Sequence, residues 1–147
     1  MKQDNLQIAH ELFQHFLEEK GLSFTRQRKF IVEQVIKDQN HFKADDVVEA
    51  LQNGSSKVSR ATVYRTLSYL EECGIIRRVD LGTGYSHFEH TLGHSHHEHL
   101  YCRKCGKIIE FFDADLEERL NTIANANHFR AATHAVLIFG VCQQCTE

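Results

Sequence analysis

The 147-residue chain lacks the marks of a membrane or secreted protein. Its longest unbroken apolar run covers residues 135–142, whereas a membrane-spanning helix needs roughly 18 or more apolar residues. The first residues mix charged with apolar side chains and contain no continuous apolar stretch of the kind a secretory signal requires. We therefore expect a cytoplasmic protein without a membrane partner, whose thiols are reduced.

The sequence also lacks an excess of basic charge, which usually argues against a nucleic-acid partner. Its 17 basic and 20 acidic side chains give a net charge of −3. The distribution is uneven, however. Residues 1–85 hold 12 basic side chains, 12 acidic ones and three histidines, whereas residues 86–147 hold 5 basic side chains, 8 acidic ones and eight histidines. Four of the five cysteines also lie in the second part. This division predicts two small domains with different roles.

Apolar periodicity and capping residues in the first part predict four helices followed by a hairpin. Apolar residues in the first helix recur at three- and four-residue intervals. Thr25 and Ser59 are placed to cap the second and fourth helices, with a short third helix between them. Residues 75–81 and 85–90 resemble two strands joined by a Gly-Thr-Gly turn. Helices followed by a hairpin predict a winged helix-turn-helix domain, which we assign to residues 1–85.

Basic side chains on both sides of the fourth helix favour a nucleic-acid role. Residues 20–32 contain four basic side chains and no acid, and residues 57–78 contain five basic side chains against two acidic ones. A helix between such patches can lie in the major groove of DNA, where arginine reads guanine and an aromatic group meets the thymine methyl. Tyr64 and Arg65 are the candidates. Charge alone fits solvated arginines on a helical bundle equally well.

Two Cys-x-x-Cys pairs predict a structural zinc site. Cys102 and Cys105 form the first pair, and Cys142 and Cys145 form the second. Four thiolates make a closed tetrahedral shell, which suits zinc and leaves no coordination position open for chemistry. A redox pair is disfavoured because no strand-to-helix redox context surrounds either motif. The remaining Cys73 lies on an apolar helical face, and we expect it to be a core residue.

A histidine-rich segment, residues 94–101, precedes the first cysteine pair. In an extended strand neighbouring side chains alternate, so His97 and His99 would face one side and His96 and Glu98 the other. Such nitrogen and carboxylate ligands suit iron, manganese, nickel or zinc, and a nonspecific metal-binding tract is the alternative. A zinc hydrolase is disfavoured because the segment lacks the second histidine of a metalloprotease helix.

The rest of the second part predicts an α/β arrangement. Residues 107–111 are typical of a strand, Asp113 can cap a helix from residue 114 to about residue 125, and residues 134–141 predict a final strand. Residues 135–139 are apolar on both faces. Such a strand is either buried at the centre of a sheet or shared across a dimer interface.

Together these motifs resemble the ferric uptake regulator family over nearly the whole chain. The resemblance depends on Ala-Thr-Val-Tyr-Arg at residues 61–65, on the segment from His96 through the first cysteine pair to Phe111, and on the late cysteine pair. It implies an α+β homodimer or higher oligomer with an N-terminal winged helix-turn-helix domain, a hinge at residues 86–95 and a C-terminal α/β dimerisation domain at residues 96–147. It also implies a metal-dependent transcriptional repressor, not an enzyme, that binds an inverted-repeat operator in double-stranded DNA.

The resemblance further implies the site residues. The regulatory metal ligands would be His41, Glu89, His97, His99 and Glu110, with His90 as the alternative to Glu89. A second metal site would use His96, Glu98, Glu117 and His134, where Glu98 replaces the aspartate that is commoner in the family. DNA contacts would come from Arg60, Thr62, Tyr64 and Arg65.

The resemblance leaves the branch of the family open. Members resembling peroxide sensors have aspartate where this chain has Glu110, so the glutamate favours a ferrous-iron-responsive regulator of iron uptake genes. Peroxide-, zinc- or manganese-responsive regulators share the scaffold, and a zinc-dependent enzyme or a metal-storage protein are the alternatives from other classes. Because His41 lies in one domain and partner ligands lie in the other, we hypothesise that a bound metal restricts the hinge and sets the spacing of two recognition helices.

Overall fold

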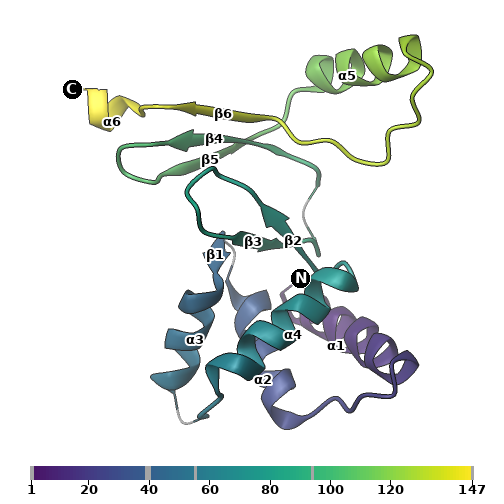
Figure 1. Cartoon of the computed structure of the whole chain (residues 1–147), viewed down its shortest axis with the longest axis vertical. Coiled ribbons are helices and arrows are strands. Elements are labelled where there is room, and N and C mark those ends of the chain that lie inside the picture. Colours follow the sequence, from purple (N-terminus) through teal and green to yellow (C-terminus); the bar gives the residue numbers. More distant parts are fainter. Residues whose placement is uncertain (1, 39–40, 55, 94, 147) are drawn as a thin grey trace. The chain divides into compact units, whose positions relative to one another are not determined.

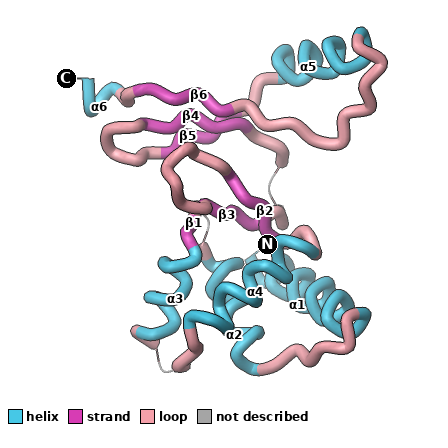
Figure 2. Tube along the Cα trace, in the orientation of Figure 1, coloured by secondary structure: helices cyan, strands magenta, loops and turns pink. Residues whose placement is uncertain are grey.

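The structure divides the chain into two compact units, Met1–His94 and Ser95–Glu147. It is a computed structural model that describes residues 2–38, 41–54, 56–93 and 95–146. Helices dominate the first unit and a sheet the second (Figure 1), and Figure 2 shows the same division by secondary structure. Among the described residues, no helix is both long and apolar enough to cross a bilayer. The α+β class predicted from the sequence is confirmed.

Four helices form most of the first unit, and local capping determines where two of them begin. The helices are α1 (Lys2–Glu19), α2 (Arg26–Lys37), α3 (Ala44–Gln52) and α4 (Arg60–Glu72). The side chain of Thr25 accepts a hydrogen bond from the backbone N–H of Arg28, and that of Ser59 accepts one from Thr62. Each cap satisfies an N–H group that the helix itself leaves without an acceptor, as the sequence predicts.

An apolar core joins the four helices. On α1, Ala9, Phe13 and Leu17 are fully buried and lie four residues apart on one face. The other helices add buried residues at helical spacing: Ile31, Val32, Val35, Val47, Val48, Leu51, Val63, Leu67 and Leu70. Cys73 packs against this core, as predicted. Gly74 then ends the α4 region with a φ of +83°, a left-handed conformation that favours glycine.

A small antiparallel sheet completes the first unit. Its strands are β1 (Phe42–Lys43), β2 (Ile76–Val79) and β3 (His87–His90), in the order β1-β3-β2. The predicted hairpin is confirmed as β2 and β3. The two-residue β1 was not predicted; it pairs with β3, and the ring of Phe42 stacks on that of Phe88 at 5.8 Å. Because β3 pairs on both sides in this sheet, residues 87–90 belong to the first unit, and the predicted hinge at residues 86–95 begins too early.

The second unit is built around a three-stranded sheet. Its elements are β4 (Glu98–Cys102), β5 (Ile108–Phe111), α5 (Ala114–Ala126), β6 (Leu137–Gly140) and α6 (Gln143–Thr146). The central strand β4 runs antiparallel to β5 and parallel to β6. The Asp113 side chain caps α5 by accepting a hydrogen bond from the N–H of Leu116 at 2.9 Å, as predicted.

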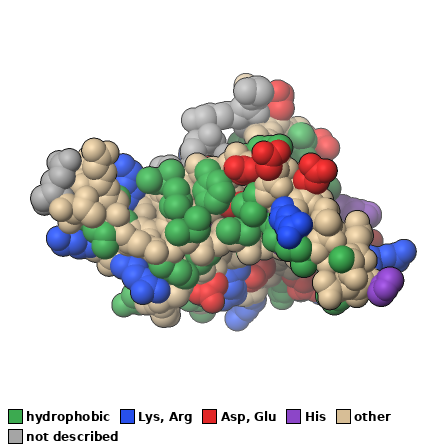
Figure 3. All heavy atoms as spheres, turned by 90° about the horizontal axis from the view of Figure 1, so that it is seen from above, with side chains coloured by type: hydrophobic (Ala, Val, Ile, Leu, Met, Phe, Trp, Pro, Cys, Tyr) green, Lys and Arg blue, Asp and Glu red, His purple; other side chains and the backbone are tan. Residues whose placement is uncertain are grey.

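Strand β6 lies at the edge of this sheet and exposes apolar side chains. Ile138 and Phe139 on β6, and Val141 just after it, are 48%, 38% and 51% exposed. Of the two alternatives for residues 135–139, a buried central strand is therefore wrong for the single chain, because β4 occupies the centre. Figure 3, which views the molecule from above relative to Figure 1, shows hydrophobic side chains gathered on this face. An exposed apolar edge strand of this kind is able to pair with another chain.

Candidate metal centres and nucleic-acid interface

Four cysteines meet where β4 and β6 end. The two strands are parallel neighbours, with Cys102 opposite Gly140, so their carboxyl ends lie at the same edge of the sheet. The turn after β4 brings Cys105 close to Cys102, and the turn at α6 does the same for Cys142 and Cys145. All four sulfur atoms lie within 4.8 Å of one another, and Cys105 Sγ is 3.7 Å from Cys142 Sγ. The predicted grouping of these residues agrees with the structure.

The cysteine cluster is electrostatically suited to a cation. The backbone N–H of Cys142 donates to Cys102 Sγ at 3.3 Å and is the largest of the effects that lower the pKa of Cys102 to about 6. The neighbouring thiols of Cys142 and Cys105 raise the pKa of Cys145 to about 12. Four thiols this close cannot all ionise alone, because their negative charges repel one another. The donor set therefore fits a zinc ion, which deprotonates and holds four thiolates.

A second cluster surrounds Glu98. It consists of His96, Glu98, Glu117 and His134, which each offer a ligand atom within 4.8 Å of the others. Glu98 Oε1 lies 2.7 Å from His96 Nε2 and 3.0 Å from His134 Nε2, while Oε2 accepts the N–H of Val136 at 2.5 Å. Burial alone would raise the pKa of Glu98, but the hydrogen bonds from Val136 and His96 lower it overall. A buried carboxylate held ionised between two imidazoles fits a divalent metal.

A different pair of imidazoles comes from His97, which lies just before β4, and His99, which lies on it. The ring centroids of His97 and His99 lie 4.9 Å apart. His97 Nε2 is 3.6 Å from Glu110 Oε1, and Glu110 lies on β5 directly opposite His99. The alternation predicted for residues 96–99 is thus confirmed, since His96 contacts Glu98 while His97 contacts His99.

The first unit assembles the two remaining residues of the predicted regulatory set. His41 lies just before β1, and its Nε2 is 2.9 Å from Oε2 of Glu89 on β3. The other oxygen of Glu89 accepts a hydrogen bond from Arg77. Because neighbouring side chains on a strand alternate, the alternative residue His90 lies on the opposite face of β3 from Glu89. The geometry around His41 therefore favours Glu89.

The predicted DNA-contacting residues lie at the start of α4. Arg60, Tyr64 and Arg65 are exposed, and the Arg60 guanidinium lies over the Tyr64 ring at 5.2 Å from its centroid. Thr62 is half-buried, and its hydroxyl lies 2.8 Å from that of Ser59, so it takes part in the helix cap. Exposed arginine and tyrosine on one helix can reach base edges in a major groove.

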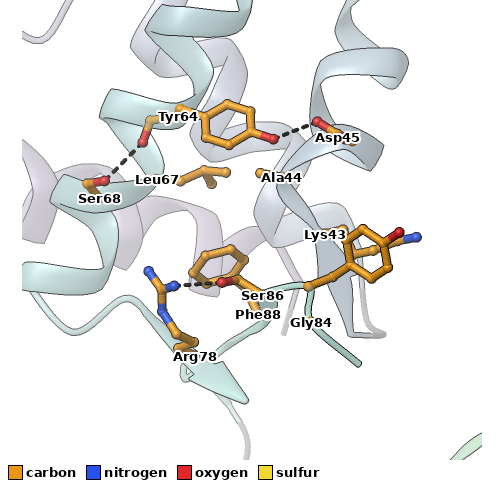
Figure 4. A pocket seen from close by; sticks show the side chains of 11 residues that line it. Lys43, Ala44, Asp45, Tyr64, Leu67, Ser68, Arg78, Gly84, Ser86 and Phe88 are labelled. Atoms are coloured by element: carbon orange, nitrogen blue, oxygen red, sulfur yellow. Dashed lines mark hydrogen bonds between the residues drawn. The ribbon is translucent and has the colours of Figure 1, made fainter. Parts of the chain in front are cut away.

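Long-range polar contacts that sequence reasoning did not predict hold α4 within the first unit. Arg78 on β2 donates to both carboxylate oxygens of Glu71 at 2.9 and 3.0 Å and to Ser86 at 2.6 Å. Tyr64 Oη donates to Asp45 on α3 at 2.6 Å. Figure 4 shows Asp45, Tyr64, Arg78 and Ser86 around a cavity of about 440 Å³ between α3, α4 and the hairpin. The pairs lie 7 to 19 residues apart, beyond the reach of helix or strand periodicity.

A winged-helix unit followed along the chain by a sheet unit with clustered metal-ligating side chains defines a class of protein, the metal-responsive DNA-binding transcription regulators. Within that class the chain belongs to the ferric uptake regulator family, whose family model matches residues 19–139. The family predicted from the sequence motifs is confirmed.

Relatives from two branches resemble the chain. The ferric uptake regulation protein of Legionella pneumophila is 38% identical over 130 residues, which cover 88% of this chain and 95% of the relative. The peroxide operon regulator of Bacillus subtilis is 35% identical over 141 residues, covering 95% of this chain and 96% of the relative. Among solved structures, the Helicobacter pylori ferric uptake regulator, described as having three functional metal-binding sites, matches with a TM-score of 0.86 at 26% identity and covers 97% of this chain and 94% of its own.

Proposed function

We propose that this protein is a dimeric repressor whose binding to DNA depends on ferrous iron and which controls iron uptake genes. The observation that supports it most strongly is the arrangement along β4. Along β4 and the two residues before it, His97 contacts His99 on one side, His96 contacts Glu98 on the other, and the strand ends at the cysteine cluster. One strand thus contributes to three candidate metal sites, the number described for the Helicobacter pylori relative.

The donor atoms of each cluster suit a particular kind of ion. Thiolates are soft ligands, and a complete shell of four suits structural zinc. The regulatory set offers nitrogen and carboxylate donors, which suit ferrous iron, with manganese or zinc as alternatives. Its members are His41, Glu89, His97, His99 and Glu110. The cluster around Glu98 offers the same donor types and is proposed as the second site.

The regulatory ligands come from both units, and this is how metal and DNA binding are coupled in the proposal. His41 and Glu89 belong to the first unit, and the other three ligands to the second. A bound metal would join the two parts, restrict the segment between the units and fix the spacing of the two recognition helices in a dimer. A coupling of about 1–3 kcal/mol would tighten operator binding by roughly 5- to 150-fold.

The remaining parts of the proposal follow from the surface of the second unit and from the cysteine site. The exposed apolar side chains of Ile138, Phe139 and Val141 support a homodimer, because they extend along a strand edge that can pair with a second copy. A closed four-thiolate site has no open position for a substrate, which supports a regulator over a zinc enzyme. The reduced thiols that such a site requires support a location in the cytoplasm. Sedimentation of the zinc-loaded protein tests the dimer: Ile138→Glu should give monomers.

A selection from random duplex DNA tests the proposed function. Zinc-loaded protein is offered the pool under anaerobic conditions, with and without ferrous iron, manganese or added zinc. The proposal expects an inverted repeat to be enriched only when a regulatory metal is present. No enriched sequence under any condition would reject DNA reading, and equal enrichment without metal would reject the metal dependence.

A peroxide-responsive regulator is the second candidate, because the Bacillus subtilis relative matches 95% of the chain. Hydrogen peroxide added to the iron-loaded protein distinguishes the two candidates. An iron-responsive repressor regains operator binding when the peroxide is removed and ferrous iron is replenished. A peroxide sensor loses binding irreversibly under the same treatment.

A further inference from the structure

One acidic residue of α3 holds two of the DNA-contacting candidates of α4. Asp45 Oδ1 accepts a hydrogen bond from Oη of Tyr64 and forms an ion pair with Nη2 of Arg60, each at 2.6 Å. Figure 4 shows the bond that leads from Tyr64 across to Asp45. All three residues belong to the first unit, so the contact is internal to the winged-helix unit.

The three side chains form a connected group at the surface. Arg60 lies over the Tyr64 ring and also donates to Oη of Tyr64 at 3.3 Å. The hydrogen bond to Asp45 raises the pKa of Tyr64. Arg60 and Asp45 are 61% and 59% exposed, so the ion pair lies where an approaching duplex would meet it. An ion pair this exposed is weak in water and can be opened by a better partner.

We propose that Asp45 is a specificity-determining residue that keeps Arg60 and Tyr64 from binding DNA of arbitrary sequence. This inference rests on the proposed function, in which α4 reads DNA. A phosphate offers Arg60 the same kind of charge-assisted bond that the carboxylate already provides, and the carboxylate repels the DNA backbone. The operator sequence additionally offers a guanine edge or a thymine methyl to these side chains. This extra interaction releases Arg60 and Tyr64 from Asp45.

Arg60 then behaves differently on unmatched DNA and on the operator. On unmatched DNA, Arg60 stays paired with Asp45 and neutralises no phosphate. On the operator, the pair is open and Arg60 contacts DNA. Removing the Asp45 charge therefore adds a phosphate contact on unmatched DNA but adds none on the operator. Each neutralised phosphate changes the slope of log K against log salt by about −0.9.

The experiment compares Asp45→Asn with wild type on two duplexes, one selected from a random pool by the wild-type protein and one of scrambled sequence. Asparagine keeps an oxygen that accepts the Tyr64 hydrogen bond, so the change is mainly one of charge. Glu49→Gln is the matched control, since it removes the same charge from an exposed position one turn further along α3. Binding of the metal-loaded protein is measured across a series of salt concentrations.

The expected result is a steeper salt slope for Asp45→Asn on the scrambled duplex, by about 0.9 for each bound subunit and so about 1.8 for the dimer, and an unchanged slope on the selected duplex. Each new contact between Arg60 and a phosphate tightens binding to the scrambled duplex by about eightfold at 0.1 M salt relative to 1 M salt. Because the selected duplex gains no such contact, the ratio of selected to scrambled affinity falls. In an Arg60→Gln background the slope difference should disappear, because the residue that makes the new contact is gone. Glu49→Gln should leave both slopes unchanged.

Two results would overturn the role of Asp45: an unchanged slope on scrambled DNA, or the same steepening on both duplexes. Weaker binding of Asp45→Asn to both duplexes would also overturn it, because the residue would then only support the fold of α3. The proposed function fails differently, since wild-type protein would then show no salt-sensitive duplex binding at all. Thermal melting of each variant identifies any loss of fold.

Discussion

Replacing Glu98 with glutamine probes the second metal site through a single charged group. The wild-type carboxylate lies between the Nε2 atoms of His96 and His134 and also accepts the N–H of Val136. Glutamine has one acceptor oxygen instead of two and no charge. In metal-free protein the lost acceptor should cost about 1–3 kcal/mol, the range for leaving a buried donor unsatisfied.

The metal-dependent part of the Glu98→Gln effect is larger and more diagnostic. A ligand at 100 times its dissociation constant stabilises the folded state by about 2.7 kcal/mol. If the substitution weakens binding about 100-fold, the same metal concentration adds only about 0.4 kcal/mol. The assay is urea unfolding followed by circular dichroism, with one equivalent of zinc kept on the cysteines and manganese present or absent.

A matched control variant and a count of the bound metal equivalents make the Glu98→Gln result decisive. Glu118→Gln changes an exposed acid of α5 next to Glu117 and should behave like wild type. Titration with cobalt should show one equivalent fewer of nitrogen- and oxygen-bound metal in Glu98→Gln than in either of the other proteins. If all three proteins bind the same number of equivalents and gain the same stability from manganese, the reasoning about Glu98 is refuted.

Three further substitutions test other parts of the account. Cys102→Ser should lose the tight zinc equivalent in metal analysis and the cooperative unfolding of the second unit, because structural zinc supplies about 10–16 kcal/mol in small domains; retention of that zinc would contradict the four-cysteine site. Arg65→Ala should weaken binding to the selected operator by about 1–3 kcal/mol in mobility-shift titrations, and a change below about twofold would show that Arg65 reads no base. Glu71→Gln should lower the unfolding free energy at pH 7 by about 0.2–1 kcal/mol, the range for exposed ion pairs. Arg78 lowers the pKa of Glu71 in the folded state, so this contribution is present above the ordinary glutamate pKa and is lost as the pH falls through the lower folded value; a difference from wild type that persists below pH 3 in urea unfolding would contradict it.

The parts of the fold that the sequence predicted depend on local interactions. Thr25, Ser59 and Asp113 cap helices by bonding to N–H groups three residues ahead, so their role can be read within one turn. The cysteine spacing predicted one cluster, because a Cys-x-x-Cys turn fixes two sulfur atoms at a time. The alternation between His96 and His99 follows from strand geometry alone.

What the sequence did not predict depends on pairings between distant residues. Strand β1 has only two residues and exists because it pairs with β3, more than forty positions later. The edge position of β6 results from β4 taking the centre of the sheet, which the apolar run of residues 135–139 cannot indicate. The contact of Asp45 with Tyr64 likewise spans 19 positions, and nothing in the local pattern marks that acid among its neighbours.

The central claim is that one metal ion, held by ligands from both units, controls DNA binding. The most direct test is the affinity of zinc-loaded wild-type protein for its selected operator, measured anaerobically with and without ferrous iron, beside the same pair of measurements on His41→Ala. If this claim is right, iron tightens wild-type binding by roughly 5- to 150-fold and leaves the binding of His41→Ala nearly unchanged. Equal wild-type affinity in the two conditions, or an undiminished response in His41→Ala, would contradict it.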